Sequence, residues 1–136
     1  MNKKRQVFLS ILLVSLSLLT ILLIPSHSSF SQTSIDRFPK DVGKIPLPKL
    51  LDFGANKCWA CVEMAPILQE LSEEYKGRAV IRVIQVREEK ELTAANKIRM
   101  IPTQIFFDSA NREIYRHEGF MDKDQIKKVF QTMRVK

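Results

Sequence analysis

The stretch NKCWACVEMAP, residues 56–66, holds both cysteines of the chain, Cys58 and Cys61, with two residues between them. An apolar run just before it predicts a buried strand over residues 50–53. Apolar side chains at spacings of three and four then predict an amphipathic helix over about residues 58–75. The two sulfurs are therefore expected where a strand passes through a short loop into a helix.

The rest of the chain predicts further strands and helices. β-branched residues predict a central strand over residues 79–86, and a helix over 88–98 completes a unit whose two strands are parallel. Residues 101–108 and 112–119 predict an antiparallel hairpin, and a capping box at Asp122 begins a final helix. We therefore expect an α/β fold, a four-stranded mixed sheet flanked by helices, that follows an N-terminal signal or anchor segment.

The first 25 residues predict a signal peptide or a membrane anchor. Residues 7–24 carry no charge and follow Lys3, Lys4 and Arg5. A helix of this length spans about 27 Å, which is close to the hydrocarbon thickness of a bilayer but longer than a usual signal-peptide apolar region. Cleavage and retention therefore both stay open. Basic residues ahead of the run keep the N-terminus in the cytoplasm. We expect the rest to be extracytoplasmic, in the periplasm or on the outer face of the cytoplasmic membrane.

Residues 26–48 predict a linker, because serine and proline are frequent there and apolar residues are sparse. The compact domain is then expected over residues 49–136. The chain has a formal charge of +7, but its basic and acidic residues are interleaved, so no nucleic-acid partner is expected. We expect the exported domain to be a monomer, attached to the membrane only if the N-terminal segment is uncleaved.

A cysteine at the start of a helix is chemically activated, because the unpaired N–H groups and the positive end of the helix dipole stabilise an anion. Such positions lower a cysteine pKa from about 8.5 into the range of roughly 3.5 to 7.5. Lys57, directly before Cys58, is expected to add a cation that lowers the same pKa further. Cys61 is expected one turn further in and shielded. Thiol–disulfide exchange needs this pair of an exposed nucleophile and a second thiol that resolves the mixed disulfide.

The sequence supports other roles for the two cysteines less well. A c-type haem needs histidine directly after the second cysteine, where Val62 stands. A structural zinc site needs four ligands, and the domain adds only His117, so such a site would have to be shared in a dimer. Copper(I) carriage by two thiolates and a merely structural disulfide also stay open. The alternative function is thus a Cu(I) or Zn carrier that uses the same sulfurs without turnover.

An ordered set of motifs resembles the thioredoxin family and covers about residues 50–129. The set is LLDFGA at 50–55, CWAC at 58–61, Pro66, IPTQIFF at 101–107 and Gly119. The resemblance implies a thioredoxin-like fold and a thiol–disulfide oxidoreductase of the protein-disulfide reductase type. It also implies no metal and no cofactor beyond a redox-active Cys58–Cys61 disulfide, and partners that are protein thiols or disulfides.

The resemblance implies roles for further residues. Asp52 would be the buried acid that passes protons to and from Cys61, and its place in an apolar strand predicts a raised pKa. Pro102 matches the cis-proline of the family, which presents the backbone of Ile101 to a substrate peptide. Trp59, between the sulfurs, is expected to form part of the docking surface.

The sequence also departs from the family pattern. Lys57 stands where tryptophan is common, and Trp59-Ala60 replaces the Gly-Pro dipeptide that is usual between the cysteines, so the choice among reduction, oxidation and isomerisation stays open. An apolar residue near Val83 replaces a lysine that many relatives carry. IPTQIFFD and RHEGF look most like exported or membrane-tethered bacterial thioredoxin-like proteins that receive electrons from a membrane thiol conduit of the cytochrome c biogenesis type. We therefore expect a reductive role toward extracytoplasmic proteins.

Overall fold

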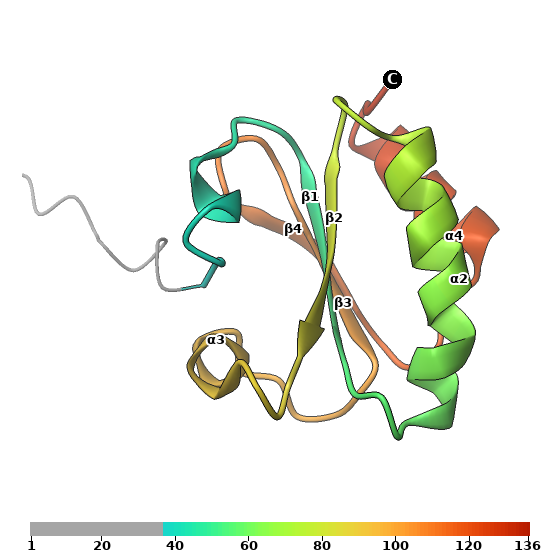
Figure 1. Cartoon of the computed structure of the whole chain (residues 1–136). Coiled ribbons are helices and arrows are strands. Elements are labelled where there is room, and N and C mark those ends of the chain that lie inside the picture. Colours follow the sequence, from blue (N-terminus) through green and yellow to red (C-terminus); the bar gives the residue numbers. More distant parts are fainter. Residues whose placement is uncertain (1–36) are drawn as a thin grey trace, which may run out of the picture. The chain divides into compact units, whose positions relative to one another are not determined.

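Across residues 37–136, the part that this computed structural model describes, four strands form one mixed sheet in the order β2-β1-β3-β4 (Figure 1). β1 pairs in parallel with β2 and antiparallel with β3, and β4 pairs antiparallel with β3. The predicted four-stranded mixed sheet is thereby confirmed. In chain order the elements are η2 (Val42–Lys44), β1 (Lys49–Gly54), α2 (Trp59–Glu74), β2 (Val80–Gln85), α3 (Lys90–Ala95), β3 (Thr103–Phe107), β4 (Glu113–Glu118) and α4 (Lys123–Thr132).

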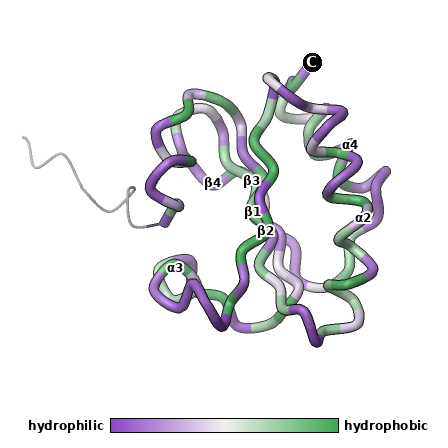
Figure 2. Tube along the Cα trace, viewed as in Figure 1, coloured by the Kyte–Doolittle hydropathy of each residue, from purple (hydrophilic) through white to green (hydrophobic). Residues whose placement is uncertain are grey.

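The helices cover both faces of the sheet. α2 and α4 lie on one face, and α3 and η2 lie on the other (Figure 1). β1 is buried at all six positions, so that Leu50 packs with the α2 and α4 side chains while Leu51 and Phe53 pack toward α3 and η2. Hydrophobic residues occupy much of the sheet, and hydrophilic residues lie on the sides of α2 and α4 that face away from it (Figure 2). β1 is therefore the centre of the fold, and its C-terminal end leads directly to the cysteines.

The helix after β2 is shorter than the sequence predicts. α3 covers Lys90–Ala95 instead of residues 88–98. Lys97, with a φ of 54°, has a left-handed backbone that ends the helix. Asn96 is fully buried at the C-cap, and its Nδ2 donates to the carbonyl oxygens of Leu92 and Arg37 at 2.9 and 2.8 Å. A tertiary contact to a distant segment therefore sets the end of this helix.

Residues 37–48, for which the sequence predicts a linker, belong to the folded domain. Phe38 and Val42 are buried, with 5% and 3% of their surface exposed. The Phe38 ring meets the ring of Phe107 on β3 edge to face, with centroids 4.7 Å apart. The linker prediction relied on the low apolar content of this segment, but these two apolar side chains are enough to hold it on the sheet. Residues 26–36 of the predicted linker lie outside the described residues.

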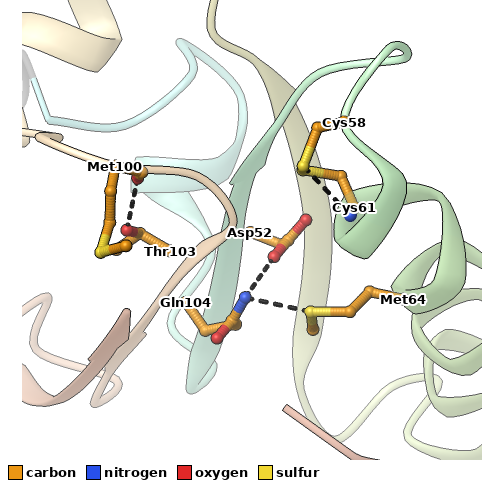
Figure 3. Close-up of a disulfide and its surroundings, with 7 residues drawn as sticks. All are labelled: Asp52, Cys58, Cys61, Met64, Met100, Thr103 and Gln104. Carbon is orange, nitrogen blue, oxygen red and sulfur yellow. Dashed lines mark hydrogen bonds between the residues drawn. A yellow bond between two sulfur atoms is a disulfide. The ribbon is translucent and has the colours of Figure 1, made fainter. Parts of the chain in front are cut away.

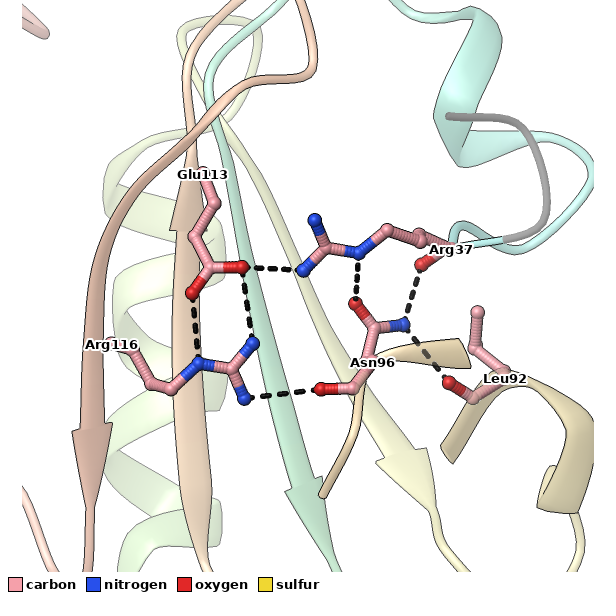
Figure 4. A network of polar contacts seen from close by, with 5 residues as sticks. All are labelled: Arg37, Leu92, Asn96, Glu113 and Arg116. Atoms are coloured by element: carbon pink, nitrogen blue, oxygen red, sulfur yellow. Dashed lines mark hydrogen bonds and ion pairs between the residues drawn. The ribbon is translucent and has the colours of Figure 1, made fainter. Parts of the chain in front are cut away.

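A polar network fixes the same segment to α3 and β4 (Figure 4). Arg37 Nε donates to Asn96 Oδ1 at 3.2 Å, and the Arg37 guanidinium also pairs with Glu113. Arg116 donates to Glu113 from Nε at 2.8 Å and to the Asn96 carbonyl at 3.1 Å. The domain therefore begins at or before Arg37, and not at Lys49.

The predicted signal or anchor segment, residues 1–25, lies outside the described residues. Between residues 37 and 136, no helix combines the length and the apolar character needed to cross a membrane.

Candidate active site

The two cysteines lie at the first turn of α2 and are joined by a disulfide (Figure 3). Cys58 is the N-cap residue with an extended backbone, and its Sγ accepts a hydrogen bond from the Cys61 N–H at 3.3 Å. Cys58 is half-buried, whereas Cys61 is buried, with 8% of its surface exposed. The first sulfur thus lies at the helix start and the second one turn inward, as the sequence predicts.

Asp52 lies on β1 below the disulfide, between it and Gln104 (Figure 3). The side chain is buried, and its Oδ1 accepts a hydrogen bond from Gln104 Nε2 at 2.8 Å. Burial raises the pKa of Asp52 to about 6, and the hydrogen bond from Gln104 acts in the opposite direction. The predicted burial and raised pKa of this carboxyl are therefore confirmed.

Gly54 lies next to both the Asp52 carboxyl and the sulfur of Cys61. A Cβ atom on Gly54 would lie 3.4 Å from Cys61 Sγ and 3.5 Å from Asp52 Oδ2. The same atom would lie 3.3 Å from Cys61 Cβ, which is a tight contact, so the glycine permits the β1 backbone to approach α2 closely. Oδ2 of Asp52 and Sγ of Cys61 therefore border the same small space.

Gln104 is a site residue that the sequence reading missed. It is fully buried on β3, in antiparallel register with Asp52. Its Nε2 also contacts Met64 Sδ on α2 at 3.2 Å, while its Oε1 is buried without a hydrogen-bond partner. One signal was present, because Gln104 is the amide in the otherwise apolar run QIFF. Its partner could be identified only from the pairing register of β1 and β3.

The peptide bond between Ile101 and Pro102 is cis, as the family resemblance implies. Pro102 is buried directly before β3. Because Thr103 pairs with Phe53 in the antiparallel register, Pro102 follows at the level of Gly54, at the cysteine end of the sheet. The Pro102 carbonyl also accepts a hydrogen bond from Gly119 N at 2.8 Å, which joins the loops before β3 and after β4.

Apolar side chains are exposed on the first turn of α2 and on the loops before β3 and after β4. Trp59 has 78% of its surface exposed, and Val62 is also exposed on the first turn of α2. Met100 and Phe120, next to the joined loops, are exposed as well, and Ile101 is half-buried. The predicted substrate-binding residues thus include one strongly exposed aromatic ring beside the disulfide.

Two further predicted positions can be placed. Lys57 is exposed in the loop directly before Cys58, and its influence on the cysteine stays a prediction. Val83 on β2 pairs with Asp52 in the parallel register, so the position where many relatives carry lysine is apolar here. The structure therefore supplies Asp52 with an amide partner, Gln104, on its other neighbouring strand.

Potential metal ligands do not gather around the sulfurs. In the described residues, no group of three His, Cys, Asp or Glu side chains is arranged to hold a metal ion. His117 lies on β4 opposite Gln104, and its Nε2 is 3.1 Å from the Phe120 carbonyl oxygen. A metal-carrier role would therefore depend on Cys58 and Cys61 alone or on a second molecule.

Comparison with known proteins identifies the family. The family model described as Thioredoxin matches residues 29–132. A thioredoxin of Acidithiobacillus ferridurans is 34% identical over 93 residues, which cover 68% of this chain and 85% of the relative. Among solved structures, the germline-specific thioredoxin Deadhead of Drosophila melanogaster is similar at a TM-score of 0.59 and 30% identity, covering 65% of this chain and 82% of that chain. Chloroplastic thioredoxin z is similar at a TM-score of 0.61 and 26% identity, covering 70% and 85%.

The matched region contains the whole arrangement of Cys58, Cys61, Asp52 and the cis Pro102. Its extent, together with the four-stranded fold, leaves one assignment. The chain belongs to the thioredoxin family of thiol–disulfide oxidoreductases, with Cys58 and Cys61 as its cysteine pair.

Proposed function

We propose that the chain is an extracytoplasmic protein-disulfide reductase, exported or held at the membrane by residues 7–24. The observation that carries the reaction is the asymmetry of the two sulfurs. Cys58 is at the helix start, and Cys61 is buried beside the space that Asp52 borders. The compartment is inferred from the basic residues ahead of the uncharged run in the sequence.

Cys58 is the nucleophile in this proposal. Its thiolate attacks one sulfur of a substrate disulfide, which forms a mixed disulfide and releases the other substrate sulfur as a thiolate that takes a proton from water. The N–H groups at the start of α2 favour the anion on Cys58. Exposed Trp59, with the backbone of Ile101 and with Pro102, forms the surface on which the substrate chain docks.

Cys61 and Asp52 complete the turnover. The Cys61 thiol gives its proton to the Asp52 carboxylate, and the resulting thiolate attacks Cys58 Sγ. The bond between Cys58 and the substrate sulfur breaks, and its electron pair leaves with the substrate, which is released as a second thiol after protonation. Two electrons have then passed from the Cys58–Cys61 dithiol to the substrate disulfide. A dithiol of a membrane protein would return them to the pair.

Single cysteine variants test these roles. Cys61→Ser should accumulate a long-lived mixed disulfide through Cys58 with partner proteins, because the attacking thiol is kept and the resolving thiol is lost. Cys58→Ser should trap no partner and have no reductase activity. Faster alkylation of Cys61 than of Cys58 at pH 6, or full turnover by either variant, would contradict the assignment.

The direction of electron flow and the carrier alternative need separate measurements. Equilibration with glutathione gives the potential of the Cys58–Cys61 pair, and a reductant should have a potential clearly below that of the glutathione couple. A pair that stays reduced in that equilibrium would support an oxidant or isomerase instead. Anaerobic titration with Cu(I) and Zn²⁺ beside an insulin-reduction assay separates the enzyme from a carrier, since a carrier binds metal tightly and reduces no insulin.

A further inference from the structure

Gln104 is an amide in a place where an apolar residue would pack more easily. Its neighbours along β3, Ile105 and Phe106, are fully buried and apolar. Buried polar atoms are almost always hydrogen-bonded, and each one that is not destabilises the fold. The unpartnered Oε1 of Gln104 carries that penalty. Packing alone therefore does not explain the amide, and its contact with Asp52 remains as the reason for its presence.

The contacts of Gln104 Nε2 fix the orientation of the Asp52 carboxyl. One reaches Asp52 Oδ1 at 2.8 Å, and the other reaches Met64 Sδ at 3.2 Å. With Oδ1 held on the β3 side, Oδ2 borders the space beside Gly54 and Cys61 (Figure 3). The oxygen that faces the inner sulfur is therefore the one that Gln104 leaves free.

Few other groups around Asp52 can exchange a proton or carry a charge. β2 offers apolar Val83 in register with Asp52, and α2 offers the sulfur of Cys61. On β4, His117 lies in register with Gln104, so that β3 separates His117 from Asp52. Lys49, also on β1, binds the carbonyl oxygens of the segment before the strand. Among the described side chains, Gln104 is the one that hydrogen-bonds to Asp52.

We propose that Gln104 is a positioning residue for proton transfer from Cys61. Its side chain holds the Asp52 carboxyl with Oδ2 toward the sulfur and stabilises the ionised form of Asp52. The inference rests on the proposed role of Asp52 as the base. A donated hydrogen bond favours a carboxylate over a carboxylic acid, and bonds to charged groups are stronger than those between neutral groups. Gln104 thus keeps the base ready at neutral pH, although burial opposes its ionisation.

The test follows the resolving step by itself. The reduced full-length protein, in detergent micelles, is mixed with an aromatic disulfide that releases a coloured thiol. The first release reports attack by Cys58, and the second reports resolution by Cys61. In the unchanged protein, the second rate should rise with pH around the Asp52 pKa of about 6. In Gln104→Met, which keeps the length of the side chain but not the donor, this midpoint should move up by about one pH unit. The second rate at pH 6 should fall several-fold, while the first is unchanged.

Two further variants distinguish the positioning of Asp52 by Gln104 from a general effect on packing. Phe106→Leu alters the same face of β3 without touching Asp52, so it should lower stability and leave the midpoint unchanged. In an Asp52→Asn background, Gln104→Met should have no further effect on the second rate, because the group through which it acts is gone. An equal effect with and without Asp52 would overturn the inference.

The outcomes also distinguish the inference from the proposed function. If Asp52→Asn slows resolution but Gln104→Met shifts neither rate nor midpoint, the positioning role is overturned and the proposed function stands. If Asp52→Asn leaves resolution unchanged at every pH, the base role of Asp52 fails, and the role of Gln104 fails with it.

Discussion

Asp52 is a buried carboxyl whose polar partner is an amide instead of a cation. Its pKa is raised from an ordinary 3.8 to about 6, mainly by burial. The folded protein therefore binds this proton more tightly than the unfolded chain does. The resulting stabilisation is fully present below pH 3.8 and is lost as the pH rises through about 6. At neutral pH the ionised Asp52 carboxylate thus lowers the stability of the folded protein.

We therefore predict that Asp52→Asn stabilises the domain at neutral pH. The gain in unfolding free energy should be about 1 to 3 kcal/mol above pH 7, because one unit of pKa shift corresponds to about 1.4 kcal/mol. It should shrink as the pH falls through about 6 and approach zero only below pH 3.8, where Asp52 is protonated in both the folded and the unfolded state. Urea unfolding of the protein and the variant across this range measures it. A difference that does not change with pH would show that packing, and not ionisation, causes the effect.

Sequence reasoning predicted most of the residues at the disulfide. The positions of Cys58, Cys61 and Asp52 relative to a strand and a helix follow from local hydrophobic periodicity, which is a short-range signal. The contact between Gln104 and Asp52 joins residues 52 positions apart. It depends on which strands are neighbours and in which register, and periodicity carries no information on register between strands distant in sequence.

At the scale of the elements, residues 37–48 show where composition misleads. Their apolar content resembles that of a linker, yet Phe38 packs on Phe107, and Arg37 binds Asn96 and Glu113. Those contacts are made with α3, β3 and β4, and a window moved along the sequence cannot detect them. The strands themselves were predicted within a few residues, because each of the two central strands, β1 and β3, contains consecutive apolar residues and is buried throughout.

We predict that this segment is required for stability. A fragment of residues 36–136 should be a soluble, cooperatively folded monomer. A fragment of residues 49–136 should lose roughly 3 kcal/mol or more, since deletion of one buried aromatic side chain alone typically has that effect. Urea unfolding and sedimentation compare the two. Within the longer fragment, Phe38→Ala should reproduce most of the loss, and the matched change at exposed Lys40, Lys40→Ala, should have little effect. Equal stability of both fragments would contradict the prediction.

At the scale of the whole molecule, the proposed location follows from residues 3–24 and is testable in intact cells. In a bacterial host, the reduced Cys58 should react with a maleimide that cannot cross the cytoplasmic membrane. Replacing Lys3, Lys4 and Arg5 by acidic residues weakens the charge bias that orients the segment, and should reduce the labelled fraction. A cytoplasmic protein with an engineered exposed cysteine serves as the control for leakage. Labelling of Cys58 only after lysis would contradict the proposed location.

The hydrogen bond from the Cys61 N–H to Cys58 Sγ places one backbone amide directly on the atom whose charge changes during turnover. A thiolate is a stronger acceptor than a thiol or a disulfide sulfur, because its full negative charge attracts the N–H dipole. The nitrogen and proton chemical shifts of the Cys61 amide should therefore follow the ionisation of Cys58. Nuclear magnetic resonance can then read the state of the reactive sulfur from the neighbouring backbone, with neither cysteine altered or labelled.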